Sequence, residues 1–82
     1  MNEAERYKPV VVDPETNIRG MHEVWFTPIR ERAGFYHKWL YDNYPGKYVW
    51  YFVPASWHRR CEFRDMDIAE NFVAFVMTTE QE

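Results

Sequence analysis

Hydrophobic and polar residues alternate along two segments, 21–26 and 57–64, and this period of two predicts a β-strand in each. Such strands place one set of side chains against a core and the other toward solvent. Segment 47–53 (KYVWYFV) is apolar on both faces, which predicts a third strand at the centre of the sheet. Residues 9–12 (PVVV) have the composition of a further N-terminal strand at an edge, because Pro9 lacks an amide donor.

A period near 3.6 predicts a helix between the strands at 21–26 and 47–53. Its apolar positions are Ile29, Ala33, Tyr36 and Leu40. Thr27 suits the N-cap and Pro28 the first helical position, and the Tyr-Pro-Gly sequence at 44–46 predicts the end of the helix. Asp65 can cap a second, short helix. The apolar side of that helix holds Ile68, Ala69 and Phe72.

Residues 73–78 (VAFVMT) combine β-branched and aromatic residues, which predicts a final strand. The order from residue 21 is then βαββαβ, the ferredoxin-like arrangement. We therefore predict an α+β fold with two helices on one face of the sheet, preceded by the strand at 9–12. The alternative is one continuous helix over 65–78 on a three-stranded sheet, and the Val, Phe and Thr run after Phe72 favours the strand.

One residue in five is aromatic, with six Phe, six Tyr and four Trp among 82 positions. A core of this size does not need so many rings, and large apolar patches on a small domain typically mark a binding surface. The length predicts one domain over 1–82, with polar, flexible ends at 1–7 and 79–82. The net charge of −3 argues against broad binding to a phosphate backbone, which needs a basic face.

Cellular location is indicated by two features of the sequence. A single cysteine, Cys61, rules out an intramolecular disulfide and fits a reducing compartment. The N-terminus is charged, and no stretch approaches the ~20 apolar residues of a membrane span. The sequence therefore predicts a cytoplasmic protein without membrane contact.

Candidate catalytic and metal-binding residues are few. His58 and Cys61 form an H-x-x-C pair, but a zinc site needs further ligands and the other histidines are not spaced as partners. Nucleophilic catalysis would need Cys61 beside a histidine base, whereas the alternation places Cys61 and His58 on opposite faces. Glycine-rich phosphate loops and hydrolase or metalloprotease motifs are absent from the sequence. We predict a protein that is not an enzyme and has no catalytic residue, metal ligand or cofactor.

Residues 61–72 (CEFRDMDIAENF) resemble the junction between the third strand and the second helix of RNA-recognition-motif domains. In that family a strand ending in Phe precedes an acidic turn and an Ala-containing helix, so the resemblance implies a ferredoxin-like topology. The family's basic-Gly-aromatic-Gly run is replaced here by His-Arg-Arg-Cys at 58–61, and RNA binding is not carried over. The short, aromatic-rich chain is also similar to many small virus-encoded proteins that bind a host factor.

The favoured function is binding to another protein. Trp57 follows a proline turn at a strand start, where a ring is hard to bury, and Tyr41 and Tyr44 lie at the end of the first helix. The predicted partner-binding residues have the Trp, Tyr and Arg composition of interface hot spots. They are Tyr41, Tyr44, Trp57, Arg59 and Arg60. We expect a small regulator or inhibitor of a partner protein, and a homodimer formed through the sheets is a close second.

Two other functions stay open. In the first, single-stranded RNA or DNA would stack on an aromatic and arginine face of the sheet. The residues for this interface are Tyr48, Trp50, Arg60 and Arg64. The negative net charge weighs against this hypothesis. The second is a small enzyme with a pocket between the sheet and the helices.

Overall fold

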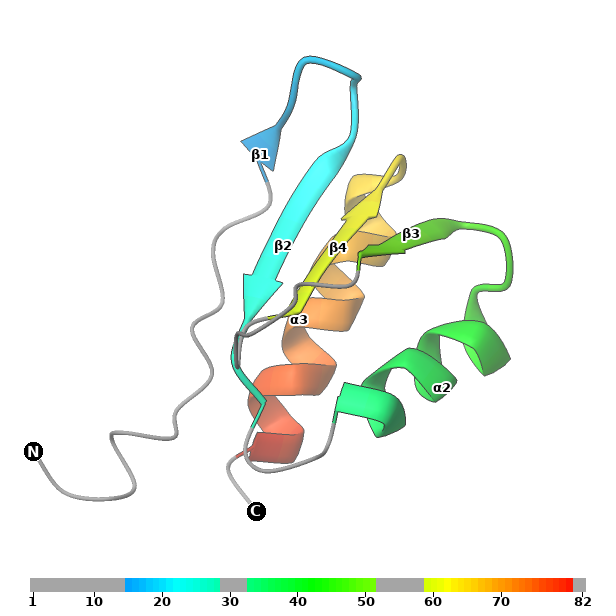
Figure 1. The fold of residues 1–82 in the computed structure, drawn as a ribbon, viewed down its shortest axis with the longest axis vertical. Coiled ribbons are helices and arrows are strands. Elements are labelled where there is room, and N and C mark those ends of the chain that lie inside the picture. The colour runs from blue at the N-terminus through cyan, green and yellow to red at the C-terminus, as the bar shows by residue number, and fades with distance from the viewer. Residues whose placement is uncertain (1–14, 29–32, 52–58, 81–82) are drawn as a thin grey trace, which may run out of the picture.

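The computed structural model describes residues 15–28, 33–51 and 59–80 (Figure 1). The elements follow in the order β1 (Glu15–Thr16), β2 (His22–Phe26), α2 (Ala33–Asn43), β3 (Tyr48–Tyr51), β4 (Arg59–Phe63) and α3 (Met66–Glu80). All strand pairs are antiparallel, and the sheet order is β1-β2-β4-β3. The predicted α+β class is confirmed.

Of the three longer strands, β2, β3 and β4, the middle one in the sheet is β4. Because β4 is antiparallel to both neighbours, β2 and β3 run parallel to each other on either side of it, joined through α2. This is the first half of a split βαβ arrangement. The segment predicted as the central strand, 47–53, contains β3, which lies at the edge of the sheet that the described residues build, and its last two residues are outside the described ranges.

The C-terminal segment departs from the prediction. Residues 73–78 lie within the helix α3, so the predicted strand there is wrong and the continuous helix is right. Ala69, Phe72 and Val76 are the buried residues of α3, and their spacings of three and four keep one helical face against the sheet. Burial of that face outweighs the weak strand preference of the β-branched residues.

The complete ferredoxin-like βαββαβ topology is consequently not confirmed. Within the described ranges, the strand beside β2 at the second edge of the sheet is β1, which precedes β2 in the chain. The N-terminal strand predicted at 9–12 lies outside the described residues.

The helix ends agree with the sequence where they are described. The α2 helix stops at Asn43, and Gly46 has a φ of 74° in the turn that follows, a conformation that glycine adopts without strain. Asp65 caps α3, since its Oδ1 accepts the backbone N–H of Asp67 at 2.9 Å. The expected start of the first helix adjoins residues 29–32, which are not described.

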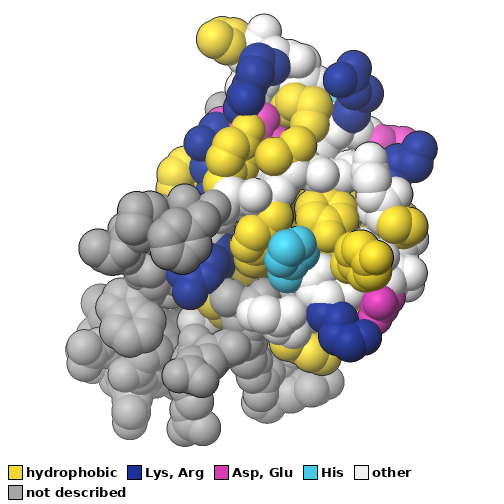
Figure 2. Space-filling view, turned by 45° about the vertical axis from the view of Figure 1, so that its right-hand side comes forward, with side chains coloured by type: hydrophobic (Ala, Val, Ile, Leu, Met, Phe, Trp, Pro, Cys, Tyr) yellow, Lys and Arg dark blue, Asp and Glu magenta, His cyan; other side chains and the backbone are white. Residues whose placement is uncertain are grey.

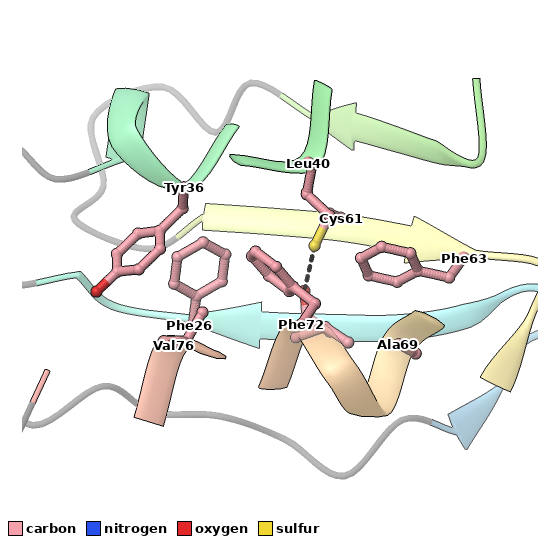
Figure 3. Packing of buried hydrophobic residues seen from close by; sticks show 9 residues of the cluster. Phe26, Tyr36, Leu40, Cys61, Phe63, Ala69, Phe72 and Val76 are labelled. Atoms are coloured by element: carbon pink, nitrogen blue, oxygen red, sulfur yellow. Dashed lines mark hydrogen bonds between the residues drawn. The ribbon is translucent and has the colours of Figure 1, made fainter. Parts of the chain in front are cut away.

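One hydrophobic core lies between the sheet and both helices (Figure 3). Phe72 of α3 lies at its centre, with ring centroids 5.3 Å from Phe26 and 5.6 Å from Phe63. The fully buried hydrophobic residues are Val24, Phe26, Tyr36, Leu40, Cys61, Phe63, Ala69, Phe72 and Val76. They come from β2, β4, α2 and α3, so both helices cover the same face of the sheet, as predicted. We call this the covered face, and the opposite one the open face.

Candidate functional site

The open face carries aromatic and charged side chains that lie in register across three strands. Trp25 of β2 pairs with Arg60 of β4, which in turn pairs with Tyr51 of β3. We call these three residues the aromatic row. Two positions further along the strands, Glu23 pairs with Glu62 in the same register. Because successive strand residues point to opposite faces, all five side chains emerge on the open face.

Arg60 is held between the two rings of the aromatic row. Its guanidinium carbon lies 5.4 Å from the ring centroid of Trp25 and 4.3 Å from that of Tyr51. Its Nε lies 2.6 Å from Oε1 of Glu23, which also accepts the indole N–H of Trp25 at 3.1 Å. Cation–π contacts and ion pairing therefore fix the orientation of both rings. Contacts within the chain therefore order the aromatic row.

Glu62 is the buried acid of the open face. Its side chain is fully buried and accepts hydrogen bonds from Asn17 at 2.7 Å and from Arg60 at 2.9 Å. Arg19 forms a further ion pair with it. Burial alone would raise the pKa of Glu62, but hydrogen bonds from Tyr51 and Asn17 and the charges of Arg19 and Arg60 lower it below the ordinary value. Glu62 is thus held as a carboxylate.

The turn between β1 and β2 folds over the open face. Asn17 organises this turn, since its Oδ1 accepts the backbone N–H groups of Arg19 at 2.8 Å and Met21 at 3.1 Å. Arg19 then reaches across the sheet and donates to the Tyr51 hydroxyl at 2.8 Å. That hydrogen bond and the charge of Glu62 raise the pKa of Arg19 above its usual value. The turn is therefore attached to the strand at the far edge of the sheet.

Sequence reasoning missed most of this network. Alternation correctly placed Glu62 on the opposite face of its strand from Cys61 and Phe63. It also predicted that the face of Glu62 would be solvated, and this expectation is wrong for Glu62, whose side chain is buried. The contacts of Glu62 with Asn17 and Arg19 join residues more than forty positions apart in the chain. Residues 13–20 (DPETNIRG) have the composition of a turn, but nothing in the sequence indicated that the turn would lie over the sheet.

The predicted partner-binding residues do not form one patch. Tyr41 is 67% exposed on α2, whereas the Tyr44 ring packs on Trp39 at 5.6 Å. Arg59 pairs with Phe26 in the strand register, so it belongs to the covered face, and Arg60 belongs to the open face. The fifth predicted residue, Trp57, lies outside the described residues. Their role in binding stays a prediction.

The predicted nucleic-acid residues are also divided between the faces. Tyr48 pairs with Phe63, and Trp50 pairs with Cys61, so these two rings are on the covered face and not beside Arg60. The expectation of one shared face is wrong, because segment 47–53 is apolar on both sides and its orientation could not be read from the sequence. The fourth residue, Arg64, is exposed beyond the end of β4.

At the margin of the covered face, His37 of α2 stacks on Trp50. The ring centroids lie 4.5 Å apart with an interplanar angle of 1°. The Tyr48 ring meets His37 edge-on at 5.5 Å. Figure 2 shows a histidine among hydrophobic side chains on the face that it presents. The sequence pattern did not identify His37 as a candidate site residue. Its position in the helix, just outside the apolar stripe, was the signal for a ring at the margin of the core.

Cys61 has the properties of a core thiol. Burial, followed by the nearby charge of Glu62, raises the pKa of Cys61 well above the ordinary value, so the thiolate form is disfavoured. Its Sγ lies 3.9 Å from the carbonyl oxygen of Val24 (Figure 3). The other half of the H-x-x-C pair, His58, is outside the described residues. Across the described ranges, no three His, Cys, Asp or Glu side chains gather as metal ligands would.

Comparison with known proteins adds no assignment. No protein-family model matches the chain, and neither a curated protein nor a solved structure matches it. Among the helices in the described ranges, none has the length and apolar character needed to cross a membrane.

Proposed function

We propose that this chain is a non-catalytic domain that docks on a partner protein through the open face and thereby regulates or inhibits that partner. The aromatic row is the observation that supports this proposal. Trp25 and Tyr51 are half-buried, and Arg60, which is 25% exposed, lies between them. Trp, Tyr and Arg are the residues most enriched in interface hot spots.

Rigidity makes this row suited to binding. Trp25 donates its indole N–H to Glu23, Arg60 forms an ion pair with the same carboxylate, and Tyr51 accepts a hydrogen bond from Arg19. A partner that packs on rings already held in place loses less side-chain entropy on binding than one that must order them. In this proposal the domain acts on its partner by occupying the partner's surface.

Charge balance on the open face favours a protein over a nucleic acid. Among the described residues of this face, Arg19 and Arg60 are paired with Glu23 and Glu62, so these four charges largely cancel. Binding to a nucleic acid backbone depends on uncompensated cations that displace counterions. An aromatic surface with balanced charge matches the core of a protein interface, in which charged residues are depleted.

The test is a capture experiment with the tagged, full-length chain and cell lysate, compared with Trp25→Ala and with Phe35→Ala. Phe35 is a matched control because it is a half-exposed ring on α2 that is not among the predicted binding residues. We expect a stoichiometric protein that resists nuclease and moderate salt, is lost with Trp25→Ala and is kept with Phe35→Ala.

Several outcomes would contradict the proposal. Loss of the captured protein on nuclease treatment would replace docking with nucleic-acid binding. Equal capture by both variants would remove the open face from the interaction. Size-exclusion chromatography of the purified chain accompanies the experiment. A dimer that dissociates in Trp25→Ala would assign the open face to a second copy of this chain.

A further inference from the structure

A cavity of about 730 Å³ opens at one end of the sheet, where β3 begins and β4 passes into α3. It is lined by Met21, Gly46, Lys47, Tyr48, Val49, Arg64, Asp65, Met66 and Ile68. Its volume lies within the range of ~300–1,000 Å³ that is typical of ligand sites. It shares no residue with the aromatic row.

Two cations and one carboxylate line the cavity, so its described charges are positive in sum. Among the residues the structure describes, Lys47 and Arg64 form no ion pair and both are exposed. Elsewhere in the described chain, Arg19, Lys38 and Arg60 are paired with carboxylates. The acid that lines the cavity, Asp65, is engaged with the first turn of α3. The cavity is therefore complementary to an anionic occupant.

The remaining walls are apolar and adaptable. Met21, Met66 and Ile68 are half-buried, and Val49 is 42% exposed. Methionine side chains are flexible and polarisable, so they fit different apolar groups. An occupant that uses the whole cavity must present an apolar side chain together with its negative charges.

We propose that this cavity binds an acidic peptide segment of a partner protein. Lys47 and Arg64 pair with the carboxylates of the segment, and an apolar side chain of the segment packs on Met21, Met66 and Ile68. A helix N-terminus favours phosphate where its N–H groups are free, but the N–H of Asp67 at the start of α3 is already bonded to Asp65. The inference does not rest on docking at the open face.

The experiment uses the full chain and a short fluorescein-labelled peptide of glutamates around a central leucine, with binding followed by fluorescence anisotropy. Lys47→Gln and Arg64→Gln each remove one charge from the cavity. Lys38→Gln removes the same charge from the exposed surface of α2 and is the control. We expect saturable binding that weakens about fivefold with each cavity variant, since a solvent-exposed ion pair contributes up to ~1 kcal/mol.

Two further peptides test the chemistry of the occupant. Replacing the glutamates by glutamines should abolish binding, and replacing the leucine by serine should weaken it. Because the cavity cations are exposed, circular dichroism is expected to show an unchanged fold in all three protein variants. Binding that is absent, or equally strong in the cavity variants and in Lys38→Gln, would overturn the proposal. So would binding of inorganic phosphate or of a labelled single-stranded oligonucleotide in preference to the peptide.

Discussion

The two faces of this sheet use their aromatic residues in different ways. On the covered face, rings pack on rings, and Phe72 makes edge or tilted contacts with Phe26, Tyr36 and Phe63. On the open face, Trp25 and Tyr51 pack on the guanidinium group of Arg60. The first arrangement excludes water and the second tolerates it. An excess of aromatic residues therefore does not indicate a single purpose.

The comparison also explains how a small domain can bury an acid. Glu62 is enclosed on the open face because arginines and an asparagine surround it, whereas Cys61, its neighbour in β4, is enclosed by hydrocarbon. Burial raises the pKa of Cys61, while the hydrogen bonds and charges around Glu62 outweigh the effect of burial and lower the pKa of that residue. Adjacent positions of one strand therefore have opposite pKa shifts because the groups around them differ.

The largest effect is expected in the covered core. Phe72→Ala removes a fully buried ring and should lower the free energy of unfolding by about 3–5 kcal/mol, a loss that could unfold a domain of this size. Urea denaturation followed by circular dichroism measures it. Phe35→Ala is the matched control, because this ring is 51% exposed and its loss should cost about 1 kcal/mol or less. Equal losses would mean that Phe72 is not the centre of the core.

A smaller effect is expected from Glu62→Gln on the open face. It removes the charge that Arg19 and Arg60 share, and it should lower the free energy of unfolding by about 1–3 kcal/mol at neutral pH. The lowered pKa of Glu62 means that its stabilising contribution is present above the ordinary value of 4.5 and is lost as the pH falls below it. The difference between the two proteins should therefore shrink on acidification in urea titrations. A constant difference would contradict an ionised Glu62 as the cause.

Trp25→Ala should separate stability from binding. The variant loses the cation–π contact with Arg60 and the hydrogen bond to Glu23, which together contribute about 1–2 kcal/mol to stability. The domain is expected to stay folded by circular dichroism while the captured partner is lost. If the variant unfolds, the aromatic row is needed for folding, and the covered core alone does not keep the domain folded. Trp25→Phe, which keeps a ring over Arg60, then tests binding in a folded domain.

The smallest effect concerns an ion pair outside both faces. Lys38 Nζ lies 2.6 Å from Asp42 Oδ2 on α2, and the two side chains are 74% and 51% exposed. Lys38→Gln should change the free energy of unfolding by less than about 0.5 kcal/mol, because solvent screens this pair. A loss as large as that of Glu62→Gln in the same urea titration would show that burial does not distinguish the two ionic contacts.

Several parts of the fold were predictable because they depend on neighbours in the chain. The alternation placed Val24 and Phe26 on one side of the first strand and Cys61 and Phe63 on one side of another, and all four are buried. The α3 helix shows the limit of local reasoning. The spacing of Ala69, Phe72 and Val76 is helical, yet the β-branched composition of 73–78 favoured a strand. Propensity and periodicity disagreed there, and contact with the sheet decided between them.

The sequence by itself determined the class of the fold, the end of the first helix at 44–46 and the cap at Asp65, because each depends on residues within about one turn of the chain. Only the tertiary structure decided which side of 47–53 faces the helices, since both sides are apolar and pairing with β4 selects one. It also enclosed Glu62 with Arg19, whose position in the chain is remote. Local preferences select elements, whereas a buried charge or an orientation depends on partners that the sequence does not place.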